Sequence, residues 1–242
     1  MRLLALDTAL GACSAAVLID GRLAGHRLEV MARGHAERLL PMAEEALAEA
    51  GLGWDSLDRL AVSVGPGTFT GVRTALAAAR GLALALDLPL TGITTLDAVA
   101  AAAQAEGPEG SQGLLLVTLD AHGGLVYAQG FAMARGGDAL VPAALAQPGL
   151  HEPEALVALL EAAQVPLADL KLAGSGAALV LAALGPRGAD IPVAGSGLPD
   201  AAEVARLAAA QPLPARPWAA PSPLYLRAPD ARLPVPRAGR PA

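Results

Sequence analysis

A short pattern occurs twice in this chain of 242 residues. The apolar run Leu3–Leu6 leads into Asp7-Thr8, and 115–121 (Leu-Leu-Val-Thr-Leu-Asp-Ala) repeats that pattern with one residue of slack. The residues after each copy also correspond, with Gly11 and Cys13–Ile19 after the first and Gly123-Gly124 and Leu125–Ala132 after the second. A duplicated strand-turn-strand unit with a carboxylate closing its first strand is typical of proteins that hold a nucleotide between two similar lobes. Two unrelated α/β halves that resemble each other through common strand residues remain the alternative.

Hydrophobic periodicity predicts strands and helices in alternation after three opening strands. The expected strands are Leu3–Leu6, Cys13–Ile19, Leu23–Val30, Leu60–Val64 and Leu90–Ile93, and the expected helices are His35–Ala50, Val72–Leu86 and Thr95–Ala105. In the second half, Leu170–Ala173 ending in Gly174-Ser175-Gly176 corresponds to the strand that ends in Gly65-Pro66-Gly67. This order predicts an α/β protein with mixed sheets and flanking helices. The pattern gives no firm assignment between 140 and 170.

The predicted lobes are residues 1–108 and 113–227. The stretch Glu106–Gly113, rich in glycine and proline, is the expected linker, and 228–242 reads as a solvated tail of prolines and arginines.

Composition excludes two classes of protein. At 54% hydrophobic and 17% charged, the chain is too apolar for intrinsic disorder. A spanning helix needs about 20 apolar residues, and the richest stretch, 75–90, is interrupted by Arg80, Asp87 and Pro89. We therefore expect a cytoplasmic protein with no membrane segment. The first 13 residues resemble a short export signal ending at Cys13, but Asp7 interrupts its apolar core, so export is the lesser alternative.

The charge of the chain argues against direct binding of nucleic acid. The formal net charge is -6, and no cluster of arginines is visible before the tail. Proteins that bind RNA by themselves usually show a basic stripe, because phosphate neutralisation supplies much of the affinity. If the protein acts on RNA, we expect a partner protein to make most of the contacts with the RNA.

Gly65-Pro66-Gly67-Thr68-Phe69-Thr70-Gly71 is the most specific run, and it lies between a predicted strand and helix. A phosphate loop has four residues between its glycines and a lysine directly after the second. Here five residues separate Gly65 from Gly71, and the nearest basic residue is Arg73. The glycines are better explained by close backbone packing, with Thr70 as the predicted N-cap.

Asp7, Thr8 and Gly11 form the candidate nucleotide site, since a carboxylate and turn amides can meet phosphate and a bound Mg²⁺. A turn made by side-chain hydrogen bonds to the backbone explains Asp7 and Thr8 equally well. The histidines at 26, 35, 122 and 151 lack the spacing that puts two ligands on one helical face, so no metal site is predicted. Ser175 lacks the spacing of a nucleophile elbow and a base that we can place.

Four segments in order resemble the TsaB (YeaZ) family. They are Leu4–Thr8, Ala12–Ala16, Gly34–Pro41 (Gly-His-Ala-Glu-Arg-Leu-Leu-Pro) and Gly65–Arg73. The resemblance is strong over 1–105 and fainter beyond, where Leu119–Ala121, Val126–Ala128 and Pro223–Arg227 still look like the family.

The resemblance implies a duplicated actin/Hsp70-like two-lobe fold and a non-catalytic, dimerising role in threonylcarbamoyl modification of tRNA. In such families the catalytic paralogue TsaD carries a metal-binding histidine pair and transfers threonylcarbamoyl from its adenylate to the adenosine beside the anticodon. This chain lacks that pair. The implied partners are TsaD, the ATPase TsaE and a second copy of the chain, with tRNA reached only through the complex. No cofactor of its own is implied, although ATP or ADP could lie at the complex interface.

The resemblance also implies that the two longest helices pack against a partner. The implied interface residues are His35, Leu39, Met42, Ala43, Ala46, Gly71, Arg73, Leu76 and Ala79. On this basis Ala43→Arg or Ala79→Arg would abolish binding and leave the monomer folded. The alternative is that these residues face the chain's own core, the usual role of an amphipathic helix. The alternative function is an active enzyme of the same fold, an ATP-dependent kinase or a metallopeptidase-like protein.

Overall fold

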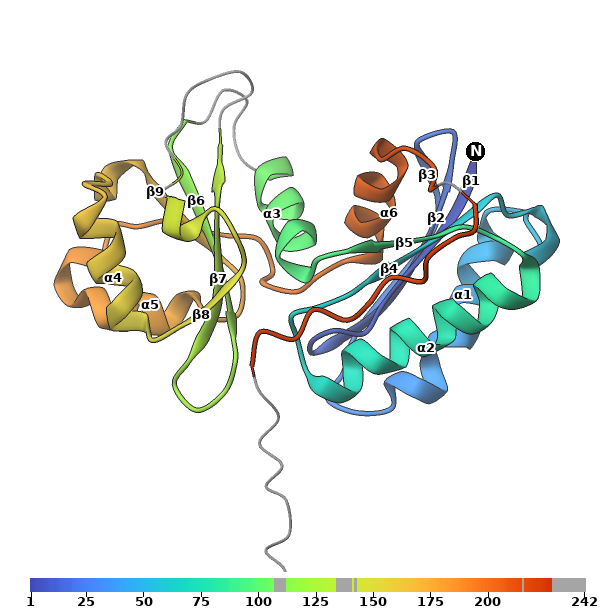
Figure 1. Cartoon of the computed structure of the whole chain (residues 1–242), viewed down its shortest axis with the longest axis horizontal. Coiled ribbons are helices and arrows are strands. Elements are labelled where there is room, and N and C mark those ends of the chain that lie inside the picture. The colour runs from blue at the N-terminus through green and yellow to red at the C-terminus, as the bar shows by residue number, and fades with distance from the viewer. Residues whose placement is uncertain (107–111, 134–140, 142, 215, 228–242) are drawn as a thin grey trace, which may run out of the picture.

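The computed structural model describes residues 1–106, 112–133, 141, 143–214 and 216–227. It consists of two five-stranded sheets, each with helices against it (Figure 1). Most of the expected linker and the whole tail 228–242 lie outside the described residues.

The first sheet has the strand order β3-β2-β1-β4-β5. Its strands are β1 (Arg2–Asp7), β2 (Ala12–Ile19), β3 (Arg22–Val30), β4 (Arg59–Ser63) and β5 (Leu90–Ile93). Its helices are α1 (His35–Glu49), α2 (Phe69–Leu86) and α3 (Thr95–Ala105), with a 3₁₀ turn at Trp54–Ser56. These strands lie within one residue of the predicted ones at each end, and the predicted bounds of β5 and α3 are confirmed.

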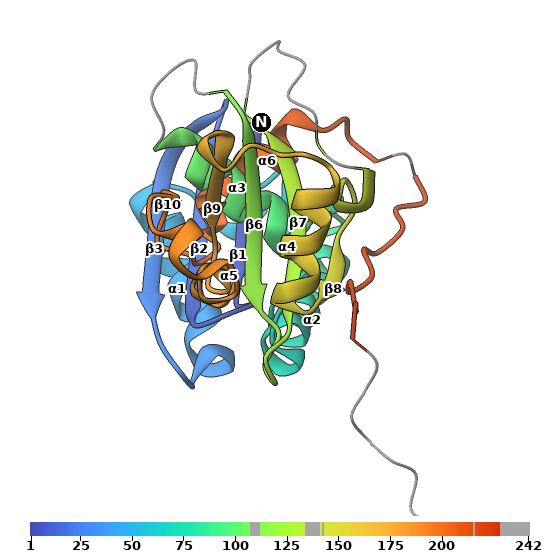
Figure 2. The ribbon, with the colours of Figure 1, turned by 90° about the vertical axis from the view of Figure 1, so that its left-hand side faces the viewer.

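The second sheet has the strand order β8-β7-β6-β9-β10. Its strands are β6 (Leu114–Asp120), β7 (Val126–Ala132), β8 (Gly149–His151), β9 (Leu170–Ala173) and β10 (Val193–Ala194). Helices α4 (Pro153–Ala162) and α5 (Ala177–Leu184) lie in front of this sheet in Figure 2. Short 3₁₀ turns lie at Ala143–Leu145, Leu167–Asp169 and Gly185–Gly188. Strand β8, helix α4 and two of these turns therefore fill the region that the sequence left unassigned.

The two halves share one topology. Each central strand, β1 or β6, pairs antiparallel with the strand that comes next in the chain and parallel with the fourth strand of its half. The glycines after the fourth strands also correspond, because Gly65 after β4 and Gly174 after β9 both have φ of +96°, a left-handed conformation that favours glycine. The predicted duplication and the predicted two-lobe α/β fold with mixed sheets and flanking helices are thus confirmed.

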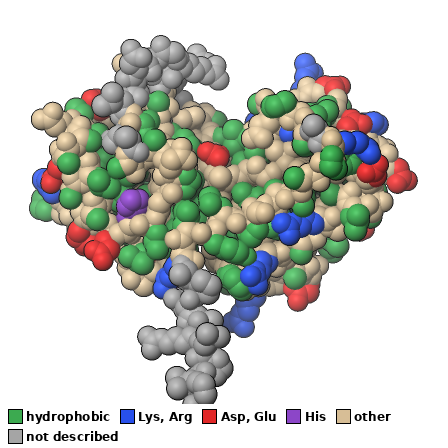
Figure 3. All heavy atoms as spheres, in the orientation of Figure 1, with side chains coloured by type: hydrophobic (Ala, Val, Ile, Leu, Met, Phe, Trp, Pro, Cys, Tyr) green, Lys and Arg blue, Asp and Glu red, His purple; other side chains and the backbone are tan. Residues whose placement is uncertain are grey.

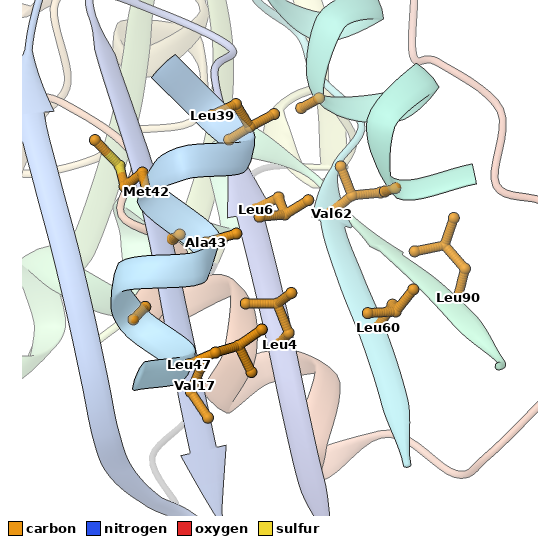
Figure 4. Packing of buried hydrophobic residues seen from close by; sticks show 14 of the residues in the cluster. Leu4, Leu6, Val17, Leu39, Met42, Ala43, Leu47, Leu60, Val62 and Leu90 are labelled. Atoms are coloured by element: carbon orange, nitrogen blue, oxygen red, sulfur yellow. The ribbon is translucent and has the colours of Figure 1, made fainter. Parts of the chain in front are cut away.

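Helices cover both faces of the first sheet. Helices α1 and α2 pack on one face through a core of leucine, valine and alanine (Figure 4). On the other face, α6 (Ala201–Ala210) packs against β1, β2 and β4. Helix α3 also contacts β6, β7 and β9, so a single core joins the two halves (Figure 1).

Helix α6 and the segment after it return to the first half. Arg59, 1% exposed, donates to the carbonyl oxygens of Gln211 and Pro212 at the end of α6 and to the Thr91 hydroxyl. The Leu224 amide donates to the Val64 carbonyl at 2.8 Å. The predicted lobe boundary placed 201–227 in the second lobe, whereas α6 packs on the first sheet and Leu224 bonds to Val64 just after β4.

Candidate functional site

Asp7 lies at the end of β1 and is fully buried. Its Oδ1 accepts a long hydrogen bond of 3.3 Å from the Ala9 amide, whereas its Oδ2 has no partner within hydrogen-bond distance among the described residues. Burial raises the pKa of Asp7 to about 7, and the nearby Asp200 carboxylate adds to the rise. Asp7 is therefore a carboxyl group whose charge is poorly compensated by its surroundings.

The Thr8 side chain forms hydrogen bonds with the first turns of α2. Its hydroxyl donates to the Gly71 carbonyl at 2.6 Å and accepts from the Ala75 amide at 3.1 Å. The α2 N-cap is Thr68, whose hydroxyl accepts from the Gly71 amide. The predicted cap at Thr70 and the predicted helix start at Val72 were wrong, because the helix begins at Phe69, one residue after the side chain that caps it.

The candidate nucleotide site is closed in this structure. Asp7 and Thr8 are fully buried, and among its three residues Gly11 alone is exposed. The counterpart of Asp7 at the end of β6 is Asp120, which is more open and accepts from the His122 amide at 2.7 Å. Nucleotide binding at Asp7, Thr8 and Gly11 stays a prediction, and it requires a rearrangement that exposes the end of β1.

Most of the predicted interface residues face the core. Figure 4 shows Leu39, Met42 and Ala43 of α1 directed at the sheet. The buried members of the predicted set are Leu39, Met42, Ala43, Ala46, Gly71, Leu76 and Ala79. His35 is partly exposed and Arg73 is exposed. As a correction, these seven belong to the monomer core, and a docking surface on α1 and α2 has to use their outward faces.

The outward face of α2 exposes large apolar side chains together with two arginines (Figure 3 shows the molecule from the side on which α2 lies in front). Phe69 is 56% exposed and Leu84 is 87% exposed. Ala77, Gly81 and Ala85 are exposed along the same helix, and Arg73 and Arg80 are its sole charged residues. Sequence periodicity did not separate this face from the inward one, because small apolar residues occupy both.

An exposed cluster of two aromatic rings and one arginine lies at the N-terminal end of α2. The Phe69 and Tyr225 rings stack with centroids 5.8 Å apart. The Arg73 guanidinium lies 3.7 Å from the centre of the Phe69 ring, and its Nε donates to the Tyr225 hydroxyl at 2.8 Å. Tyr225 and the segment around it were matched to the family from sequence, but nothing in the sequence placed them beside α2.

Two further features lie apart from these residues. A pocket of about 340 Å³ between α3, α6 and β7 is lined by Ile93, Asp97, Ala100, Ala101, Gln104, Phe131, Leu207 and Gln211. Among the described residues, no group of three or more His, Cys, Asp or Glu side chains could hold a metal ion.

Helix α2 is also long and apolar enough to cross a membrane, judged by length and composition. Core helices of soluble proteins pass the same test, and the inward face of α2, with Val72, Ala75, Leu76 and Ala79, is buried against the first sheet.

Comparison with known proteins identifies relatives. The family model described as "TsaD: tRNA N6-adenosine threonylcarbamoyltransferase" matches residues 25–210. The tRNA threonylcarbamoyladenosine biosynthesis protein TsaB of Escherichia coli strain K12 is 40% identical over 127 residues, which are 52% of this chain and 53% of that protein. The chain thus spans about half the length of the curated relatives it matches.

Two solved structures from Pseudomonas aeruginosa are similar over nearly their whole length. One, described as an uncharacterized protein with similarity to peptidase YEAZ, has a TM-score of 0.74 and 32% identity, covering 93% of this chain and 99% of that one. The other, YeaZ, has a TM-score of 0.71 and 33% identity, covering 86% of this chain and 90% of that one. These relatives and the family model show together that the chain belongs to the TsaB (YeaZ) family, whose members the TsaD family model also matches.

Proposed function

We propose that this chain works in tRNA threonylcarbamoyladenosine biosynthesis as a non-catalytic subunit in the cytoplasm. In this role it docks on the TsaD transferase through the outward faces of α1 and α2, and it reaches tRNA through the complex. A weaker pairing with a second copy uses the same faces.

The apolar outward face of α2 is the observation that carries this proposal. Leu84 is 87% exposed and Phe69 is 56% exposed, and the other exposed residues of α2 are Thr70, Arg73, Ala77, Arg80, Gly81 and Ala85. Large apolar side chains on a helix surface are normally covered by another element. Ala77 and Gly81 leave room for a partner helix beside Phe69 and Leu84, which supports a helix-on-helix contact.

Charge adds a second support. The outward side of α1 carries Glu37 and Glu44, neither of which forms an ion pair among the described residues. The exposed charges of α2 are Arg73 and Arg80. A two-fold arrangement that places α1 of one protein on α2 of the other brings these opposite charges together. A second copy, or a paralogue of the same fold, fits such an arrangement.

The test is co-purification of the full chain with TsaD after substitution of the outward face. Leu84→Glu places a charge on the apolar face and is expected to weaken binding at least tenfold. Val193→Glu is the matched control, because Val193 is also an exposed apolar residue, 51% exposed, but lies on β10 in the other half. Equal binding by both variants and the unchanged protein would refute docking through α2.

Calorimetry with ATP and Mg²⁺ separates the subunit from an active kinase. Nucleotide binding and turnover by the chain alone would favour the enzyme, whereas binding only in the presence of TsaD would favour the subunit. The same titration with Asp7→Asn tests whether Asp7 takes part. A role for TsaE stays a prediction, and its addition to the assembled pair would test it.

A further inference from the structure

The terminal segment 221–227 contacts both halves of the molecule. It comes after α6 and runs along α2 toward the second half in Figure 1. It forms no helix or strand, so its position depends on side-chain and single backbone contacts.

Four contacts hold the segment to the first half. Arg80 of α2 donates to the Pro221 carbonyl, and the Leu224 amide donates to the Val64 carbonyl after β4. Pro221 also lies against Gly92 of β5, where a Cβ would come within 2.8 Å of the proline ring. The stack of Tyr225 on Phe69, bridged by Arg73, is the fourth contact and lies at the surface.

The next two residues reach the second half. Leu226 packs against the core that joins α3 to the second sheet, a cluster that includes Leu10 and Leu119. Arg227 Nη1 donates to the Ala121 carbonyl at 2.8 Å and to the His122 carbonyl at 3.2 Å, both in the turn between β6 and β7. Seven residues therefore connect α2 to the turn after the central strand of the other half.

We propose that segment 221–227 is a strap that holds the two halves together, and that a partner docking on the outward face of α2 releases it. Phe69 and Arg73 belong to that face and also bind Tyr225. A partner that covers Phe69 competes with the Tyr225 ring for the same surface. Loss of the Tyr225 contact leaves Pro221 and Leu224 as the segment's attachments to the first half. The bridge to the second half through Leu226 and Arg227 is then held less firmly, and the halves move further apart about the core that joins them. The coupling to a partner rests on the proposed function, whereas the strap itself does not.

The strap can be tested in the full chain without any partner. Spin labels at Asp55→Cys and Ala158→Cys place one exposed probe on each half, and Cys13 is fully buried and will not be labelled in the folded protein. Pulsed electron resonance then gives the distribution of distances between the halves. Tyr225→Ala combined with Arg227→Ala is expected to broaden the distribution toward longer distances.

Arg216→Ala is the matched control. Arg216 lies in the same terminal region, but it pairs with Asp87 of the first half and covers the Trp218 ring. The control should keep the narrow distribution of the unchanged protein. A distribution for the double variant identical to that of the control would overturn the strap.

Addition of TsaD to the labelled, otherwise unchanged chain tests the coupling. The expected result is the same broadening that the double variant shows alone. Binding without broadening would overturn the coupling and leave the proposed function intact, and absence of binding would overturn both. The measurement on the chain alone decides the strap in either case.

Discussion

Replacing Asp7 by asparagine is expected to stabilise this protein at neutral pH. The side chain is fully buried, and burial raises the pKa of Asp7 to about 7 from its usual 3.8. One pKa unit corresponds to about 1.4 kcal/mol between the two protonation states. The charged carboxylate therefore lowers the free energy of unfolding by about 4 kcal/mol above pH 7.

The pH dependence gives the sign of the effect. Below pH 3.8 Asp7 is protonated in both the folded and the unfolded chain, and it does not change the free energy of unfolding. Between 3.8 and about 7 the unfolded chain alone loses the proton, so stability falls as the pH rises. Above pH 7 Asp7 is charged in both states, and the loss in the free energy of unfolding no longer changes with pH. Asparagine keeps the acceptor for the Ala9 amide and cannot ionise, so Asp7→Asn removes this slope.

Urea denaturation between pH 4.5 and 8, monitored by far-ultraviolet circular dichroism, measures the difference between Asp7→Asn and the unchanged protein. The gain in stability should be small at pH 4.5 and approach about 4 kcal/mol at pH 8. Asp58→Asn is the control of opposite sign, because hydrogen bonds from Arg2 lower the pKa of Asp58; its stabilising effect should be constant from pH 4.5 to 8, since it is lost only below the unfolded pKa of 3.8. A difference for Asp7→Asn that is flat or negative from pH 5 to 8 would refute the reasoning.

Two further predictions concern the core. Ala43→Arg and Ala79→Arg should prevent folding, because both alanines are fully buried between helix and sheet and an arginine there is both too large and charged. Ala77→Arg on the exposed side of α2 should keep a normal melting curve, and soluble, folded Ala43→Arg protein would contradict this assignment. Arg59→Met should lower the free energy of unfolding by about 3 kcal/mol in urea denaturation, since it leaves the Gln211 carbonyl and the Thr91 hydroxyl without their charged donor. Hydrogen exchange should quicken at the end of α6, and unchanged exchange there would argue against a capping role for Arg59.

The sequence was sufficient where local pattern decides the structure. Short apolar runs between turn residues located the strands of the first sheet to within one residue, and the repeated Leu-Leu pattern ending in Asp predicted the duplication that the two sheets share. The start of α2 was harder, because Thr68 and Thr70 can both cap a helix. The Gly71 amide reaches back to Thr68, and that choice depends on packing against Thr8 and Ala9.

Long-range placement had no local signal. Helix α6 has an ordinary amphipathic pattern. That pattern does not indicate that the helix packs on a sheet whose strands lie more than a hundred residues earlier in the chain. The buried Arg59 reads in the sequence as an exposed charge, and its partners at Gln211 and Pro212 are distant in the chain. The same limit applies to Tyr225, whose stacking on Phe69 depends on the return of the chain to the first half.

The two faces of α2 explain why most of the predicted interface residues lie in the core. Leu76 and Ala79 look inward and Ala77 and Leu84 look outward, yet both pairs are apolar, so helical periodicity cannot assign either pair to the core. Helix α1 differs, because its outward side carries glutamates and its inward side is apolar. A docking surface that relied on α1 would therefore be held mainly by charge, which salt screens. Since α2 supplies the exposed apolar area, loss of binding from Leu84→Glu should persist at high salt, whereas loss from Glu44→Ala should be confined to low salt.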